Sequence, residues 1–227
     1  MRFVTVAGPP SSGKTSVMVH TIKRLLEDDI KVAVGKIDCN DTPDGTRFKS
    51  LGVPVVVGLS GDLCPDHYYV SNLEEILCWA RKQNAEITIL ETAGLCHRCA
   101  PAIVGCLSIV VIDTLSGIDT PRKIGPVLLT ADVVVITKGD IVSQAERDVF
   151  RQRVRQINPS SEVYECNGLT GKGSIQLKNI ITGSPELMSL ADKCLRSSMP
   201  ACICSYCTGE TRIGNSFQLG NVLKIES

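Results

Sequence analysis

The sequence of 227 residues lacks a net charge, because its 24 Lys and Arg residues are balanced by 24 Asp and Glu residues. It also lacks an apolar run near the roughly 20 residues that a membrane-spanning helix needs, and its first residues lead into an apolar run without a signal-peptide pattern. Without a basic field or an apolar span, we expect neither a nucleic-acid nor a membrane partner. These absences favour a cytoplasmic protein with one large α/β domain.

Cysteine, by contrast, is abundant, with 11 residues. A reducing compartment argues against a disulfide framework, so metal or redox chemistry is the better explanation. Some of these cysteines stand alone in the sequence and are predicted to be small buried hydrophobic residues: Cys39, Cys78, Cys106, Cys166 and Cys194. The others cluster in three segments.

The segment GPPSSGKT at residues 8–15 follows an apolar run and precedes a helical pattern, as the motif G-x-x-x-x-G-K-[ST] requires. Its glycines let successive N–H groups converge on one phosphate, and the helix N-terminus adds its positive dipole end. Lys14 is predicted to reach the β/γ-phosphates, and the Thr15 hydroxyl to bind Mg²⁺. The predicted phosphate-binding set is Gly8, Pro10, Ser11, Ser12, Gly13, Lys14, Thr15, Ser16 and, from a later segment, Gly94.

Two carboxylates follow predicted strands and are candidates for the same site. Asp38 ends the predicted strand 31–37 and is a candidate Mg²⁺-binding or water-holding group, with an ordinary Asp of a polar turn as the alternative. Glu91 ends the predicted strand 86–90, where an open sheet faces its ligand crevice. We expect Glu91 and Gly94 to sense the γ-phosphate and the attacking water, so Lys14, Asp38 and Glu91 form the candidate catalytic set.

A base-recognition motif follows in the sequence Thr137-Lys138-Gly139-Asp140, which has the form [NT]-K-x-D. The Asp140 carboxylate can accept from both the N1–H and the 2-amino group of guanine, a donor pair that adenine lacks, so the motif predicts GTP rather than ATP. The Lys138 stem can lie along the base plane. The glycine-rich turn at 167–173, with Asn167, Gly168 and Leu169, is predicted to bring N–H groups to the guanine O6.

Cys64 and His67 flank a proline in a predicted loop over residues 61–67, and S/N ligation suits Zn²⁺, Ni²⁺ or Cu. Two ligands do not complete a site. This pair therefore closes across a dimer interface, recruits other cysteines, or is a loop with a buried thiol.

The remaining clusters are Cys96 with Cys99, and the C-terminal C-x-C-x-x-C of Cys202, Cys204 and Cys207. The C-x-x-C pair is half of a zinc or iron–sulfur site. The three C-terminal thiols can hold one ion with an open coordination position, as a relay site needs. The alternative is a structural zinc knot completed by Cys194 or another nearby thiol.

The order of apolar runs and helical patterns predicts a mostly parallel sheet flanked by helices, a P-loop NTPase fold at residues 1–196 with a cysteine-rich extension at 197–227. Further predicted strands cover residues 53–59, 108–113, 133–136 and 162–166. Predicted helices cover 16–26, 73–83, 144–157, 174–181 and 186–195, with a loop at 117–126. Beyond the sheet, only residues 221–225 are a candidate strand.

With these motifs placed, residues 5–181 resemble the urease accessory G protein and, less closely, the hydrogenase nickel-insertion G protein, both of the dimerising SIMIBI class of P-loop GTPases. The resemblance is carried by residues 8–15, 37–38, 61–67, 110–126, 137–140 and 167–173. The sequence departs from the pattern where Asp66 is inserted in the Cys-Pro-His motif, where Thr137 replaces Asn, and where Glu91-Thr92-Ala93-Gly94 replaces a glycine-richer switch.

The resemblance implies a metal-loading GTPase. GTP and Mg²⁺ would bring two subunits together, their Cys and His side chains would hold a soft metal (Ni²⁺ or Zn²⁺), and slow hydrolysis would release it to a client metalloenzyme or its accessory proteins. One alternative is a nucleotide-driven activator of a metalloenzyme or corrinoid protein, with an iron–sulfur cluster on Cys96 and Cys99 of both subunits. Another is a nucleotide switch with structural cysteines.

Overall fold

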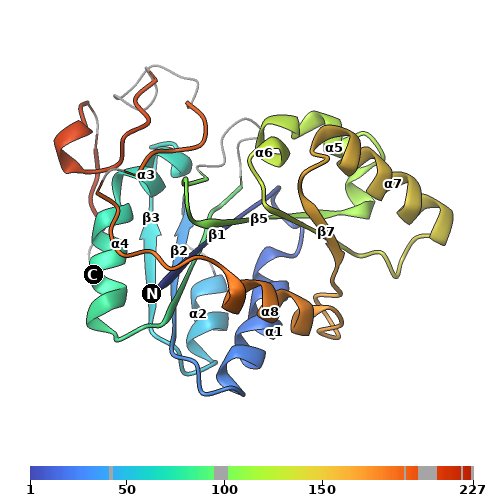
Figure 1. Cartoon of the computed structure of the whole chain (residues 1–227), viewed down its shortest axis with the longest axis horizontal. Helices are drawn as coiled ribbons and strands as arrows, with labels where there is room; N and C mark the ends of the chain where they lie inside the picture. Colours follow the sequence, from blue (N-terminus) through green and yellow to red (C-terminus); the bar gives the residue numbers. More distant parts are fainter. Residues whose placement is uncertain (41–42, 95–101, 192, 199–208, 221, 226–227) are drawn as a thin grey trace.

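The computed structural model describes residues 1–40, 43–94, 102–191, 193–198, 209–220 and 222–225. Seven strands form one sheet in the order β3-β2-β4-β1-β5-β6-β7, and every neighbouring pair is parallel (Figure 1). The predicted α/β class is therefore confirmed. The strands are β1 (Arg2–Ala7), β2 (Val32–Asp38), β3 (Val55–Leu59), β4 (Ile87–Glu91), β5 (Leu107–Asp113), β6 (Val133–Thr137) and β7 (Glu162–Glu165).

The central strands are continuous apolar runs because helices cover both faces of the sheet. One face is covered by α1 (Lys14–Leu26), α2 (Asp44–Lys49) and α8 (Ser174–Gly183), which lie together on one side in Figure 1. The other face is covered by α3 (Pro65–Ser71), α4 (Leu73–Lys82), α5 (Thr120–Lys123), α6 (Gly125–Leu129) and α7 (Gln144–Ile157). Two short 3₁₀ helices, η1 (Thr114–Ser116) and η3 (Asn215–Phe217), complete the described elements.

Strand β5 illustrates how both faces are filled. All seven of its residues are buried. Ile109 and Val111 pack in the apolar cluster that contains Met18 of α1, whereas Val110 and Ile112 pack in the cluster that contains Phe150 of α7. Since alternate residues of a strand point to opposite faces, no polar face remains along this strand.

The first strand in sequence lies at the centre of the sheet. β1 pairs with β4 on one side and with β5 on the other, so the strand order reverses at β1. In open parallel sheets a crevice for ligands forms beyond the carboxyl ends of the strands at such a point. The chain leaves β1 through Gly8, whose φ is +136° and where a Cβ would lie 2.0 Å from the Val111 carbonyl oxygen. Only glycine permits this close approach.

Helix α7 shows a boundary that the sequence predicted at both ends, residues 144 and 157. Its start is fixed by a capping box, in which the Ser143 hydroxyl accepts from the Glu146 N–H and the Glu146 carboxylate accepts from the Ser143 N–H. This reciprocal pair satisfies two N–H groups that a helix start would leave unpaired.

The loops predicted over residues 61–67 and 117–126 are partly wrong, because the structure has short helices there. α3 begins at Pro65, and α5 and α6 each carry a proline in their first turn. Proline fits this position because its missing N–H is one that the first turn cannot use, and its fixed φ suits a helix. His67 is therefore a helical residue rather than a loop residue.

The helix predicted over residues 186–195 is also wrong, because that segment pairs with others as extended chain. Leu195 forms an antiparallel bridge with Ile103, and Cys194 forms one with Arg212. The Leu195 N–H donates to the Thr211 carbonyl at 2.8 Å. We call the pairing of residues 102–104, 193–196 and 211–213 the C-terminal ladder. Its hydrogen bonds to distant segments replace those that a helix would make, so tertiary pairing overrides local propensity.

The described residues beyond the ladder pack on α3 and α4 (Figure 1). Buried Asn72, between these helices, donates to the Leu223 carbonyl at 3.0 Å and accepts from the Ile225 N–H at 2.7 Å. Ile213 and Ile225 are buried in the same apolar cluster as Tyr69. Residues 222–225 form no strand, contrary to the candidate strand at 221–225.

Candidate functional site

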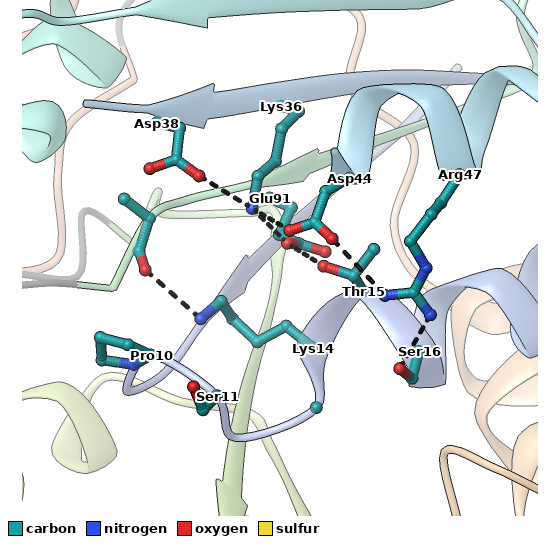
Figure 2. A pocket seen from close by; sticks show the side chains of 12 residues that line it. Pro10, Ser11, Lys14, Thr15, Ser16, Lys36, Asp38, Asp44, Arg47 and Glu91 are labelled. Atoms are coloured by element: carbon teal, nitrogen blue, oxygen red, sulfur yellow. Dashed lines mark hydrogen bonds and ion pairs between the residues drawn. The ribbon is translucent and has the colours of Figure 1, made fainter. Parts of the chain in front are cut away.

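A cavity of about 410 Å³ opens at the carboxyl ends of β1, β2 and β4 (Figure 2). From the predicted phosphate-binding set it is lined by Pro10, Ser11, Gly13, Lys14, Thr15 and Ser16, whereas Gly8, Ser12 and Gly94 do not line it. The rest of the lining is Lys36, Asp38, Asp44, Arg47, Glu91 and Ala93. The cavity therefore brings together Lys14, Asp38 and Glu91, the three residues of the predicted catalytic set.

The Lys14 ammonium is held at the cavity wall by backbone oxygens. It donates to the carbonyls of Gly8 at 3.0 Å, Pro9 at 2.9 Å and Ala93 at 3.4 Å. Burial lowers the pKa of Lys14, and the nearby Glu91 carboxylate opposes that effect. The ammonium thus links the loop after β1 to the segment after β4.

Gly94 brings the segment after β4 against the loop after β1. Its φ is +75°, and a Cβ there would lie 1.7 Å from the Gly8 carbonyl oxygen and 3.0 Å from Lys14 Nζ. Such distances exclude any side chain in this arrangement. Gly94 therefore shapes the phosphate cavity from behind, although it does not line it.

Five polar side chains form a compact network on one side of the cavity (Figure 2). Glu91 is fully buried, and its Oε1 accepts from the Thr15 hydroxyl at 2.7 Å and from the Lys36 ammonium at 2.6 Å. The same ammonium lies 3.2 Å from Asp44 Oδ2 and 3.6 Å from Asp38 Oδ2. Oε2 of Glu91 is buried without a hydrogen-bond partner among the described residues.

The charges of this network support one another. Burial tends to lower the pKa of Lys36, but attraction to Glu91 and Asp44 outweighs burial and raises it. Burial tends to raise the pKa of Asp44, but the Lys36 ammonium and other partners lower it. Both groups therefore carry their charges at neutral pH.

Sequence reasoning missed Lys36 and Arg47. Arg47 donates to the Ser16 hydroxyl at 2.9 Å, which joins α2 to the start of α1. A signal for Lys36 was present, because a lysine is rarely fully buried inside an apolar strand unless it is paired. Arg47 offered no such signal, since no helix was predicted at residues 44–49.

A second cavity of about 210 Å³ adjoins the first and shares Gly13 and Ser16 with it. It is lined further by both predicted base-recognition segments, through Thr137, Lys138, Asp140, Ile141, Asn167, Gly168 and Leu169. All six residues predicted for base recognition therefore lie around one cavity.

The base-recognition segments are tied to the loop after β1. Lys138 donates to the Ser11 carbonyl at 2.9 Å, and the Thr137 hydroxyl donates to the Ser12 carbonyl at 2.6 Å. Thr137, where Asn is usual, thus makes a direct bond to that loop. The Asn167 side chain accepts from the Leu169 and Thr170 N–H groups at 2.8 and 3.0 Å, which fixes the glycine-rich turn.

The predicted metal ligands are only partly described. Cys64 precedes the first residue of α3 and is half-buried, and His67 lies in the first turn and is buried. Asp66 between them is 1% exposed, with both carboxylate oxygens unbonded among the described residues. Burial raises the pKa of Asp66 to about 7.

The described residues contain no group of three side chains placed to hold a metal ion. Cys96, Cys99, Cys202, Cys204 and Cys207 lie outside the described residues.

The isolated cysteines differ in burial. Cys106 and Cys166 are buried as predicted, and burial raises the pKa of each thiol to about 11. The prediction was wrong for Cys78, which is exposed on α4, while Cys39 and Cys194 are half-buried.

No helix within the described part of the chain is both long and apolar enough to span a bilayer.

Comparison with known families places these cavities in context. The family model described as "CobW/HypB/UreG, nucleotide-binding domain" matches residues 2–165, which include the loop after β1, Glu91 and Asp140. The chain belongs to the CobW/HypB/UreG family. Its members are P-loop GTPases of the SIMIBI class, so the family resemblance seen in the motifs is confirmed.

Individual relatives of this CobW/HypB/UreG protein agree with the assignment. An uncharacterized protein of Methanocaldococcus jannaschii is 51% identical and covers 100% of this chain and 97% of its own. The urease accessory protein UreG of Trichodesmium erythraeum is 28% identical over 78% of this chain and 88% of its own.

Two solved structures share the fold. The hydrogenase maturation factor HypB of Archaeoglobus fulgidus has a TM-score of 0.65 at 22% identity, covering 81% of this chain and 89% of its own. HypB of Helicobacter pylori, solved in complex with nickel, has a TM-score of 0.64 at 18% identity, covering 83% and 91%.

Proposed function

We propose that this member of the CobW/HypB/UreG family binds and hydrolyses GTP. In this proposal, nucleotide-dependent dimerisation couples hydrolysis to the delivery of a transition metal to a client metalloenzyme, and nickel is the first candidate for that metal. The observation that carries the proposal is the pair of adjoining cavities. One cavity is lined by side chains that suit phosphate groups, and the other is lined by Asp140. Gly13 and Ser16 line both cavities. A guanine nucleotide fits this division into a phosphate end and a base end.

In this proposal Lys14 and the N–H groups of residues 11–16 hold the phosphates. Lys14 already lies among carbonyl oxygens, so a phosphate replaces weaker acceptors with a charged one. Glu91 and Asp38 flank the same cavity and are proposed to orient the attacking water. Phosphoryl transfer needs positioning and charge stabilisation rather than covalent chemistry, so we expect slow turnover by the isolated protein.

At the base end, Asp140 is proposed to accept both guanine donors while Lys138 lies along the base. The bond from Lys138 to the Ser11 carbonyl couples base recognition to the phosphate loop. Asn167, Gly168 and Leu169 line the same cavity. A pocket built around paired hydrogen bonds rejects adenine because the carboxylate would stay unpaired.

The donor set at the phosphate end suits Mg²⁺. The Thr15 hydroxyl and the Asp38 carboxylate are hard oxygen ligands, and the unbonded Oε2 of buried Glu91 has unused acceptor capacity beside them. Thr15 and Asp38 would hold the ion, which when bound supplies charge neutralisation at the phosphates. Thr15 donates its hydroxyl hydrogen to Glu91, which leaves the lone pairs of the hydroxyl oxygen available to a cation.

The transported metal is proposed to bind Cys64 and His67 from two subunits, giving four ligands at a symmetric interface. Cys96, Cys99, Cys202, Cys204 and Cys207, which lie outside the described residues, are proposed as further thiolate ligands.

The choice of nickel and of an accessory role is supported by the names of two relatives. UreG is named as a urease accessory protein, and HypB of Helicobacter pylori was solved with nickel. For this chain, nickel and the accessory role remain parts of the proposal.

The test compares metal content and oligomeric state after anaerobic purification, with and without a non-hydrolysable GTP analogue. Wild-type protein should dimerise with the analogue and bind more Ni²⁺ per chain, as measured by light scattering and elemental analysis. Lys14→Ala should do neither, because it loses the phosphate contact. Cys64→Ala should dimerise but bind less metal.

Two outcomes would count against the proposal. A Lys14→Ala protein that dimerises with the analogue breaks the link between nucleotide and assembly. Equal Ni²⁺ binding with and without the analogue breaks the link between assembly and metal. A brown protein with a visible absorption band would instead identify an iron–sulfur cluster and favour an activator.

A further inference from the structure

Strand pairing aligns Lys36 with one residue of each neighbouring strand, in a row that runs across the sheet. Among the described residues of this row, Lys36 is the only one with a positive charge. Its Cα is the register partner of Glu91 on β4, and Glu91 in turn is the partner of Val6 on β1. Register partners in a parallel sheet project to the same face, so strand pairing fixes the ammonium beside the Glu91 carboxylate. The Lys36 side chain is 3% exposed.

The network around Lys36 balances three negative charges with few cations. Glu91, Asp44 and Asp38 lie 2.6, 3.2 and 3.6 Å from the Lys36 ammonium. Lys14 and Arg47 contribute the other positive charges of this cavity. A GTP molecule brings about four negative charges of its own, so the carboxylates alone would repel it.

We propose that the Lys36 ammonium neutralises the carboxylates of the phosphate cavity before the nucleotide binds. Lys36 thereby sets the affinity of the nucleotide-bound protein for Mg²⁺. This inference rests on the proposed GTP site. Lys36 is a positioning residue in this role, because it acts through Glu91, Asp44 and Asp38. It has two opposite effects: it favours the metal-free nucleotide by reducing repulsion, and it opposes Mg²⁺ by competing for the same oxygens.

Lys36→Met tests the idea because it removes the charge and keeps most of the length. Calorimetry with a non-hydrolysable GTP analogue in EDTA measures metal-free binding, and electron paramagnetic resonance of free Mn²⁺ measures divalent binding to the protein–analogue complex. The variant should bind the metal-free analogue at least tenfold more weakly and Mn²⁺ at least tenfold more tightly. Both changes follow from losing one positive charge a few ångströms from these ligands, at an effective dielectric constant of about 20.

The matched control is Lys31→Met. Lys31 is exposed just before the other end of β2, so the same chemical change should alter neither affinity. A damaged fold would weaken both interactions together, whereas the proposal requires shifts of opposite sign. If Lys36→Met weakens both, or behaves like Lys31→Met, the proposal is wrong.

Removing a buried partner of Glu91 can also prevent folding, so a second variant keeps the test decisive. Asp44→Asn removes one negative charge at a partly exposed site. It should strengthen metal-free analogue binding and weaken Mn²⁺ binding, the reverse of Lys36→Met. Unchanged or weaker metal-free binding by Asp44→Asn overturns the proposal. Failure of the wild-type protein to bind the analogue with Mn²⁺ refutes the GTP site itself.

Discussion

Gly94 allows a stringent test of the packing behind the phosphate cavity. Its backbone has a φ of +75°, and a Cβ would overlap the Gly8 carbonyl oxygen at 1.7 Å. Gly52 has nearly the same φ, +78°, but a Cβ there would meet nothing within 4 Å. The two Gly→Ala variants therefore carry similar backbone strain and differ in the clash alone.

The expected costs follow from these two terms. A left-handed backbone costs a residue with a Cβ about 1–2 kcal/mol, so Gly52→Ala should lower the free energy of unfolding by that amount. Gly94→Ala adds an overlap with backbone that no side-chain rotation relieves, and such overpacking costs about 1–3 kcal/mol more. Its total should be about 2–5 kcal/mol.

Urea unfolding measures both free energies, and titration with a labelled GTP analogue measures the site. Gly94→Ala should lose most nucleotide affinity because relieving the clash displaces Gly8 and the carbonyls around Lys14. Gly52→Ala should bind normally. Equal stability and equal nucleotide binding by the two variants would refute the close approach of the Gly94 segment to the loop after β1.

Three further changes test other parts of the molecule. Asp140→Asn should shift preference from GTP towards xanthosine triphosphate in a competition assay, and unchanged selectivity would remove Asp140 from the base site. Arg196→Met should lower the free energy of unfolding by about 2–3 kcal/mol, because the guanidinium donates to both Asp132 oxygens at 2.8 Å and to the Ile103 carbonyl of the ladder at 3.2 Å. Unaltered urea unfolding would contradict this. Asn72→Ala should cost about 1–3 kcal/mol and speed proteolysis within residues 209–225, since it removes both bonds to that segment; wild-type cleavage rates would argue against the anchor.

Much of the fold was predictable because its signals are local. Buried strands of a parallel sheet are continuous apolar runs, and the functional groups follow directly where each run ends, as Asp38 and Glu91 do. The capping box at Ser143 and Glu146 marks the start of α7 within four residues of sequence. The glycine and lysine spacing at residues 8–15 likewise specifies a phosphate loop without reference to the rest of the chain.

What failed depends on partners far apart in sequence. Lys36 and Glu91 are 55 residues apart, and only strand register makes them neighbours. The segment around Leu195 has a helical pattern, yet bridges to Ile103 and to residues 211–212 give it an extended shape. Proline misled for a different reason, because at Pro65 it starts a helix rather than breaking one.

The central position of β1 governs when the nucleotide site can form during synthesis. The ribosome releases β1 and the loop after it first, but their neighbours β4 and β5 end at residues 91 and 113. At about 5–20 residues per second, the nascent chain has a bare central strand for several seconds before both flanking strands exist. During that interval the loop has neither Gly94 nor Val111 against it. We therefore expect a truncated or stalled chain that lacks β5 to be aggregation-prone. Under the proposed function, GTP stabilises the protein only after half of it has been made.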